Sequence, residues 1–296
     1  MWLSCGYRAI QVFDEVQKTN LPVAFLYPAL AEERTESFGP YSIDVAKDAS
    51  MAATALPLIV LSHGNGGTPW AYRDIAKHLA RSGYVVALPE HIGNSRTDNS
   101  REKTAANLEN RPRHVSLAID AAFADPVIGP QLLKGHVGMI GHSIGAYTAL
   151  AVARGRPWAA SHETPDRQPR SVNVQPDSRV SALVLLMPAT FWFIADSLKE
   201  VKIPILIRTG SRDAITPSSH AETIIRGVAN SCLVQHEVIL GAGHFSAMSK
   251  FPAALASPTF PPSQDPQGFD REAYQPTLFA DVERFLNVNL KNSHSS

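Results

Sequence analysis

Residues 137–153 read VGMIGHSIGAYTALAVA and place Ser143 between two glycines, where an apolar run meets a helix-forming run. The apolar run has the character of a buried strand, and the segment after it has the composition of a helix. One interpretation is that Ser143 only caps this helix. The other is that the G-x-S-x-G string, Gly141 to Gly145, holds Ser143 on a tight strand-to-helix turn, exposed for attack on a carbonyl carbon. The strand before the string and the helix after it favour the second interpretation.

The composition limits the class of protein. The chain has 296 residues, of which 44% are hydrophobic and 18% charged, and this predicts a single globular domain over residues 1–296. Lys plus Arg equals Asp plus Glu at 27 each, so no net charge attracts nucleic acid or an anionic membrane. We therefore expect a small-molecule partner, with no nucleic acid. The oligomeric state stays open.

The two cysteines and the start of the chain bear on the compartment. Cys5 and Cys232 are too few for a disulfide framework, and whether they form a single bridge stays open. The first residues lack a basic segment followed by an apolar one, and no apolar stretch approaches 18 residues. We expect a cytoplasmic protein without a stable membrane anchor.

Apolar runs and helical patterns alternate along the chain. Strands are predicted at residues 21–28, 41–46, 56–64, 84–90, 136–141, 180–188, 203–210 and 232–240, and helices at 68–83, 115–123, 144–155, 216–228 and 278–286. Such repeated units predict an α/β fold, with a mostly parallel central sheet and helices on both faces. Ligands of these sheets bind beyond the carboxyl ends of the strands.

Two insertions interrupt the alternation. Segments near 155–179 and 250–276 are rich in proline and polar residues, so neither should hold a long helix. Loops of this length in a compact domain are usually functional lids or disordered excursions. We expect them to form a small cap or lid.

A serine hydroxyl needs a base, and the base needs a group that fixes its tautomer. His244 follows the last predicted strand in a glycine-containing loop, and Asp213 follows the strand before it. The order Ser, Asp, His along the chain is the one that this topology uses. Asp166 and Asp196 are alternatives for the acid, since both lie in loops.

Two segments are candidates for holding an oxyanion. The helix that follows Ser143 directs free N–H groups and a positive dipole end toward its start, so the amide of Ile144 is one predicted donor. The loop SHGNGGTP at 62–69 is the predicted source of the other, because its glycines let backbone approach a ligand closely. The alternative interpretation of that loop is a glycine turn that opens a helix.

Several strings resemble the α/β-hydrolase superfamily, and within it the bacterial proteins described as predicted dienelactone hydrolases, related to platelet-activating-factor acetylhydrolases. The strings are PVAFLYPA, PLIVLSHGNGG, AKHLARSGYVVALPEHIGN, RPRHVSLAIDAA, GMIGHSIGAYTAL, GSRDAITP and GAGHF, in that order. The resemblance implies an α/β-hydrolase fold, a triad of Ser143, Asp213 and His244, and oxyanion amides at Asn65 and Ile144. Dienelactone hydrolases themselves carry a cysteine where this chain has Ser143.

These features predict a serine carboxylic-ester hydrolase that works through an acyl-enzyme, with no metal and no organic cofactor. One alternative is an amidase or acyltransferase that uses the same triad. Another is a non-catalytic binding module, because a fold does not by itself fix a function.

The predicted substrate pocket is apolar. Phe191 and Trp192 follow a strand at the active edge, and the other candidates, which lie near the catalytic loops or end a strand at that edge, are Gly66, Trp70, His91, Phe245 and Met248. Such a wall suits a small to medium, fairly apolar ester. The alternative is that the aromatic side chains only pack a helix onto the core.

Overall fold

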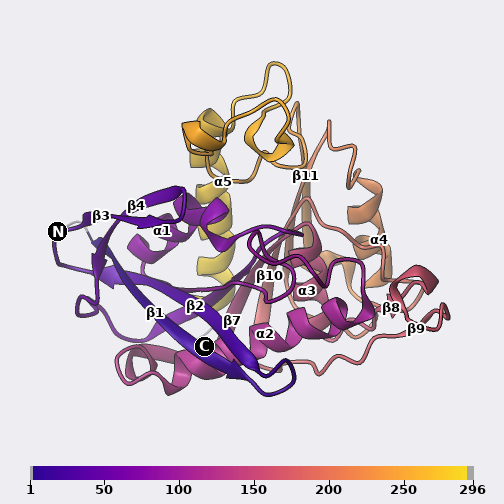
Figure 1. Ribbon diagram of the computed structural model, residues 1–296, viewed down its shortest axis with the longest axis horizontal. Helices are drawn as coiled ribbons and strands as arrows, with labels where there is room; N and C mark the ends of the chain where they lie inside the picture. Colours follow the sequence, from indigo (N-terminus) through magenta and orange to yellow (C-terminus); the bar gives the residue numbers. More distant parts are fainter. Residues whose placement is uncertain (1–2, 292–296) are drawn as a thin grey trace.

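The computed structural model describes residues 3–291 and is built around a ten-stranded sheet (Figure 1). The strand order is β12-β11-β10-β7-β5-β6-β2-β1-β4-β3. Strands β12 to β6 of this order are parallel to one another, and β2 joins β6 antiparallel. The strands are β1 Ser4–Asp14, β2 Thr19–Ala29, β3 Arg34–Phe38, β4 Tyr41–Lys47, β5 Leu56–Ser62, β6 Val85–Pro89, β7 Leu132–His142, β10 Val180–Leu186, β11 Ile205–Gly210 and β12 Val234–Ile239.

Helices cover both faces of this sheet. One hydrophobic cluster packs apolar residues of α1 and α5 on one face, and a second cluster packs α2, α3 and α4 on the other. The predicted mostly parallel sheet with helices on both faces is therefore confirmed. The helices are α1 Arg73–Arg81, α2 Ala105–Ala124, α3 Ile144–Val152, α4 Ser219–Gly227 and α5 Arg271–Leu286, and α5 continues as a π-turn, Asn287–Lys291.

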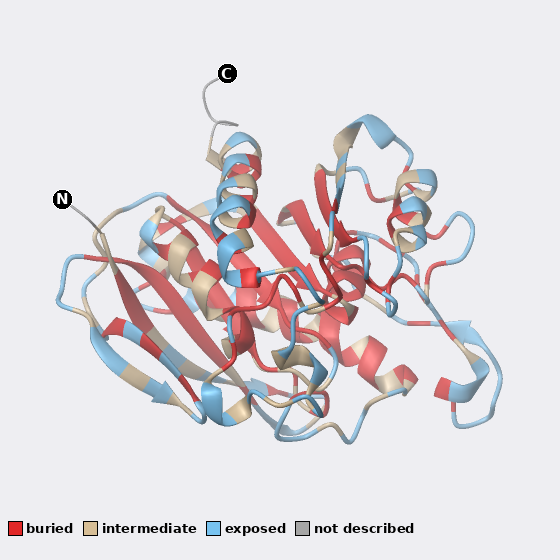
Figure 2. Cartoon of the chain, turned by 90° about the horizontal axis from the view of Figure 1, so that it is seen from above, coloured by how far each residue is buried: buried red, intermediate tan, exposed pale blue. Residues whose placement is uncertain are grey.

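The alternation of side chains within one strand supplies both clusters. In β5, Leu58 and Val60 pack on the α2 side and Ile59 and Leu61 on the α1 side, all of them almost completely buried. Figure 2 shows that the strands in the middle of the molecule are buried. Because successive side chains of a strand point to opposite faces, a strand covered on both faces must be apolar throughout. Each such side chain stabilises the fold by about 1.5–3 kcal/mol relative to an exposed one.

Two strands of the ten-stranded sheet were not predicted. Strand β1 pairs antiparallel with β2 along all its length, yet its second half alternates partly buried and exposed residues, among them Arg8 and Gln11. Strand β3, sequence RTESF, is an edge strand without a buried residue. Neither strand carries the apolar run or the clean alternation that marks a strand in sequence, because the second half of β1 has only partly buried and exposed residues before Asp14, and β3 buries none of its residues.

The 155–179 insertion contains only short elements, as its proline content predicts, whereas the last six residues of the 250–276 insertion form the start of the 16-residue helix α5, with Pro276 inside it. Residues 155–179 form a two-stranded sheet, β8 Trp158–Ala159 with β9 Arg170–Ser171. Residues 250–276 form two single 3-10 turns, Ala253–Leu255 and Pro261–Ser263, before α5 begins at Arg271. The remaining 3-10 turns are Pro69–Tyr72, Gly129–Gln131, Ser161–Glu163 and Ser231–Leu233.

The cysteines do not form a bridge. Cys5 is buried in β1, Cys232 is exposed, and both are free thiols. Within residues 3–291, no helix has both the length and the apolar character that crossing a membrane requires.

Candidate active site

Ser143 sits on a strained turn between β7 and α3. Its φ of 55° and ψ of −121° are unusual for a residue with a side chain. A Cβ on Gly145 would lie 2.0 Å from the carbonyl oxygen of Ser62, and one on Gly141 would lie 2.3 Å from the carbonyl oxygen of Gly145. Both positions therefore require glycine. The Ser143 side chain makes no capping hydrogen bond to α3, so the interpretation as a simple helix cap is wrong.

Three side chains from separate strand ends converge beside this turn. Ser143 Oγ lies 3.0 Å from His244 Nε2, and His244 Nδ1 lies 2.8 Å from Asp213 Oδ2. Ser143 follows β7, Asp213 follows β11 and His244 follows β12. Asp166 and Asp196, the alternatives for the acid, are both exposed, and Asp196 pairs with Lys199. The structure thus places the predicted histidine within hydrogen-bond distance of both the predicted serine and Asp213.

Asp213 is held as a carboxylate. Its Oδ1 accepts hydrogen bonds from the backbone amides of Ile215 at 2.9 Å and Thr216 at 2.8 Å, which leaves Oδ2 for His244. Burial acts to raise the pKa of Asp213, but the hydrogen bond and the charge of His244 together with the Thr216 contacts outweigh it. The net pKa lies below the ordinary value for aspartate, so this residue is negatively charged at neutral pH.

Thr216 is a site residue that sequence reasoning missed. The sequence suggests that Thr216 opens the following helix, but α4 begins at Ser219. The Thr216 hydroxyl lies 2.9 Å from Asp213 Oδ2, 3.0 Å from His244 Nδ1 and 3.0 Å from the carbonyl oxygen of Met187. An aspartate followed three residues later by threonine is a signal of such a turn, because the carboxylate can bind the amides just after it.

His142, the residue before the serine, connects three loops of the site. Its Nε2 lies 2.7 Å from the carbonyl oxygen of His244, and its Nδ1 lies 2.8 Å from the Tyr72 hydroxyl. A carbonyl only accepts, so Nε2 carries the proton and Nδ1 accepts the proton of the Tyr72 hydroxyl. The Tyr72 oxygen in turn accepts from the amide of Gly64 at 3.3 Å. This chain of hydrogen bonds braces the His244 loop and the Gly64 loop against the turn at Ser143.

Buried neutral histidines predict a marked pH dependence of stability. Burial, then the charge of His244, lowers the pKa of His142 to about 3, and burial, then the charge of Arg111, lowers that of His63 to about 3. The unfolded chain, with a histidine pKa of about 6.5, binds protons that the folded chain does not, so stability is lost as pH falls from 6.5 toward 3. Between pH 7 and pH 5 we expect a loss of about 2 kcal/mol for each of the two.

Urea unfolding at several pH values measures this effect. The variant His142→Gln should weaken the pH dependence by one of these two contributions, whereas His162→Gln, which alters an exposed histidine, should not. An unfolding free energy of His142→Gln that falls between pH 7 and pH 5 as steeply as that of the parent would contradict the assignment.

The segments of both predicted oxyanion donors lie against the serine. Ile144 is the first residue of α3, so its amide is at the positive end of that helix. A Cβ on Gly64 would lie 3.6 Å from the Ser143 Cβ, which shows how closely the glycine loop passes. The side chain of the next residue, Asn65, is fixed on both sides, since its Nδ2 donates to Glu102 at 2.7 Å and its Oδ1 accepts from Asn94 at 2.7 Å.

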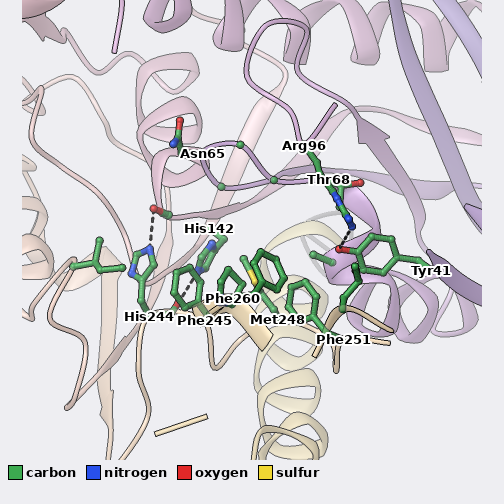
Figure 3. Close-up of a pocket in the computed structure, with 18 of the residues that line it drawn as sticks. Tyr41, Asn65, Thr68, Arg96, His142, His244, Phe245, Met248, Phe251 and Phe260 are labelled. Carbon is green, nitrogen blue, oxygen red and sulfur yellow. Dashed lines mark hydrogen bonds between the residues drawn. The ribbon is translucent and has the colours of Figure 1, made fainter. Parts of the chain in front are cut away.

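An aromatic cavity of about 480 Å³ opens on one side of Ser143. Its wall includes three of the predicted pocket residues, Gly66, Phe245 and Met248. Sequence reasoning missed the residues that come from distant segments. The aromatic and basic residues missed are Tyr41, Arg96, Phe251 and Phe260. Figure 3 shows them along the cavity, with His244 near one end and Tyr41 and Arg96 near the other. Phe251 and Phe260 belong to the insertion at 250–276.

A second cavity of about 490 Å³ also reaches Ser143. The predicted pocket residues Phe191 and Trp192 line it, together with Asn65 and Ile144, whose backbone amides are the predicted oxyanion donors. The insertion at 155–179 contributes Ala160, His162 and Glu163, and helix α2 and the segment before it contribute Glu102, Lys103, Thr104, Asn107 and Leu108. Each insertion therefore supplies part of the wall of one cavity.

Two predicted pocket residues lie elsewhere. Trp70 stacks on Phe38 at 3.7 Å between ring centroids and lines neither cavity at Ser143. His91 is completely buried, with its Nε2 2.8 Å from Ser62 Oγ and its Nδ1 3.2 Å from His114 Nδ1. Nearness in sequence to the site loops was misleading, because both side chains turn away from the cavities into the protein's own packing.

Comparisons with known proteins agree with this architecture. A family model for the alpha/beta hydrolase fold matches residues 57–198. A bis(hydroxyethyl) terephthalate hydrolase from Streptomyces coelicolor is 24% identical, with 74% of this chain and 66% of the relative covered, so the chain spans just under two thirds of the length of that relative.

Solved structures share the fold at low sequence identity. A ferulic acid esterase from Streptomyces cinnamoneus superposes with a TM-score of 0.71 at 18% identity, covering 99% of this chain and 91% of that one. A dienelactone hydrolase from Anabaena variabilis gives a TM-score of 0.57 at 16% identity, covering 97% and 99%. Strand order, family match and structural neighbours together identify this chain as a protein of the α/β-hydrolase fold.

Proposed function

We propose that the protein is a serine carboxylic-ester hydrolase that acts through Ser143, His244 and Asp213. The observation that carries the proposal is the continuous hydrogen-bonded line from Ser143 Oγ through His244 to Asp213, at 3.0 and 2.8 Å, beside two cavities. A serine becomes a nucleophile when a neutral imidazole accepts its proton, and the carboxylate selects the tautomer that accepts at Nε2.

The mechanism has two acyl-transfer steps. In the first, His244 Nε2 takes the Ser143 proton while the oxygen attacks the ester carbonyl carbon, and the amides of Asn65 and Ile144 stabilise the negative oxygen that forms. Protonated His244 then gives this proton to the departing alcohol. In the second step, water attacks the acyl-serine with the same base, and the released acid leaves Ser143 free.

The two cavities indicate how an ester is divided between them. In this mechanism the leaving oxygen receives its proton from His244, and of the two cavities at Ser143 His244 lines only the aromatic one, which supports assigning the alcohol part to that cavity. The acyl part then extends past Ile144 into the second cavity. A small to medium, fairly apolar ester with two substantial halves fits this arrangement. The relatives named for terephthalate and ferulate esters support the same substrate class.

A fluorophosphonate probe combined with matched substrates tests the proposal. The probe should label the parent and not Ser143→Ala, and p-nitrophenyl esters should be hydrolysed far faster than the matching p-nitroanilides. Labelling at another residue would refute the assigned nucleophile. Faster anilide cleavage would indicate an amidase, and loss of the ester without release of its free acid would indicate an acyltransferase.

A further inference from the structure

The largest completely buried side chain among the described residues is a cation, Arg111 on helix α2. None of the ion pairs formed within residues 3–291 involves it, although its neighbour two residues later, Arg113, pairs with Asp14 at 2.8 Å. Burial lowers the pKa of the Arg111 guanidinium to about 9, so the group is still charged at pH 7. A buried charge without a carboxylate is costly and needs a compensating role or full hydrogen bonding.

Four neutral oxygens surround the Arg111 guanidinium. It donates through Nε to Thr148 Oγ1 at 3.0 Å, through Nη1 to Asn94 Oδ1 at 2.6 Å, and through Nη2 to Ser62 Oγ at 3.2 Å. Nη2 also donates to the carbonyl oxygen of His63. The planar fork of arginine supplies several donors at fixed angles, which a lysine ammonium cannot reproduce.

These contacts reach both segments that bear the proposed oxyanion donors. The His63 carbonyl directly precedes Gly64 and Asn65, and Asn94 also donates to Asn65 Oδ1 at 2.7 Å. On the other side, Thr148 Oγ1 donates to the carbonyl oxygen of Ile144 at 3.0 Å. One rigid group therefore links the loop after β5 to the first turn of α3.

We propose that Arg111 is a positioning residue that holds the amides of Asn65 and Ile144 at the separation an oxyanion requires. The inference rests on the proposed function, because it concerns the same reaction. Displacing a reacting group by about 1 Å costs on the order of 10²-fold in rate, and loss of one oxyanion donor costs about 10²–10³-fold. The guanidinium's hydrogen-bond partners are all neutral, so no carboxylate among them offsets its positive charge. That charge therefore also stabilises the negative oxygen that forms during the reaction.

The test compares Arg111→Lys with Arg113→Lys, the same change two residues away on the same helix. For Arg111→Lys we expect kcat per titrated active site to fall about 10²-fold with KM within threefold, because the amides bind only the transition state tightly. Inhibition by a trifluoromethyl ketone, which forms a similar oxyanion, should weaken by a comparable factor. Arg113→Lys should keep kcat within threefold.

Thr148→Val provides a second measurement with little change in side-chain volume. It removes the contact between Arg111 and the Ile144 segment, and kcat should fall about tenfold at unchanged KM. In the double variant the two losses should not multiply, since both break one connection. If Arg111→Lys does not fold, a Thr148→Val variant with the kcat of the parent overturns the proposal.

The outcomes separate this inference from the proposed function. Wild-type kcat and inhibitor affinity in folded Arg111→Lys would overturn the role of Arg111 while Ser143→Ala is still inactive. A loss confined to thermal stability or to KM would overturn it as well. Full ester hydrolysis by Ser143→Ala would instead refute the proposed function itself.

Discussion

Replacing Ser143 with alanine is expected to lower kcat for ester hydrolysis by about 10⁶-fold. Without the Ser143 oxygen, 3.0 Å from His244 Nε2, no acyl-enzyme forms, and only the amides and the cavities remain to assist attack by water. The serine side chain makes no capping bond, so the fold should be preserved. Initial rates on a p-nitrophenyl ester, with circular dichroism as the check on folding, measure the effect.

Ser178→Ala is the matched control, because Ser178 is exposed and lines neither cavity at Ser143. It should retain the parent rate. Activity of Ser143→Ala within tenfold of this control would show that another group attacks the ester.

Asp213→Asn is expected to lower kcat by about 10⁴-fold while the protein stays folded. An asparagine amide facing His244 Nδ1 would donate rather than accept, so the imidazole would carry its proton on Nε2 and could no longer accept the proton of Ser143. The carboxylate also stabilises the imidazolium that forms in each step. Steady-state kinetics on the same ester, with the melting temperature recorded in parallel, test this expectation.

Asp166→Asn and Asp196→Asn are the controls, since both residues were alternatives for the acid and both are exposed. Each should leave kcat unchanged. A large loss in either of them, combined with near-normal activity of Asp213→Asn, would move the acid to that residue.

Local sequence determined the central strands, because each is buried on both faces and must be apolar throughout. Strands β1 and β3 escaped prediction because most of their residues are partly buried or exposed, so neither shows an apolar run or a clean alternation. The start of one predicted helix also differs from the structure. Thr68, the predicted first residue of the helix at 68–83, instead caps a 3-10 turn, Pro69–Tyr72, and α1 begins only at Arg73.

In the candidate site, too, some residues could be predicted from the sequence and others could not. Ser143, Asp213 and His244 could be proposed from sequence because each lies in a short motif just after a strand, and the parallel sheet brings such ends to one edge. The residues that line the cavities could not be predicted in this way, because they depend on the direction in which each side chain points. Tyr41 and Phe260 line the same cavity although 219 residues separate them in the chain, while Trp70, near a site loop, stacks on Phe38.

Each insertion contributes to one cavity only, so the walls of the two cavities can change independently of each other. A change of length or composition in 250–276 alters the room beside His244, whereas a change in 155–179 alters the room beyond Ile144. We therefore expect chimeras that exchange one segment to change recognition of only one proposed half of the ester, the alcohol or the acid, with Ser143, His244 and Asp213 unchanged.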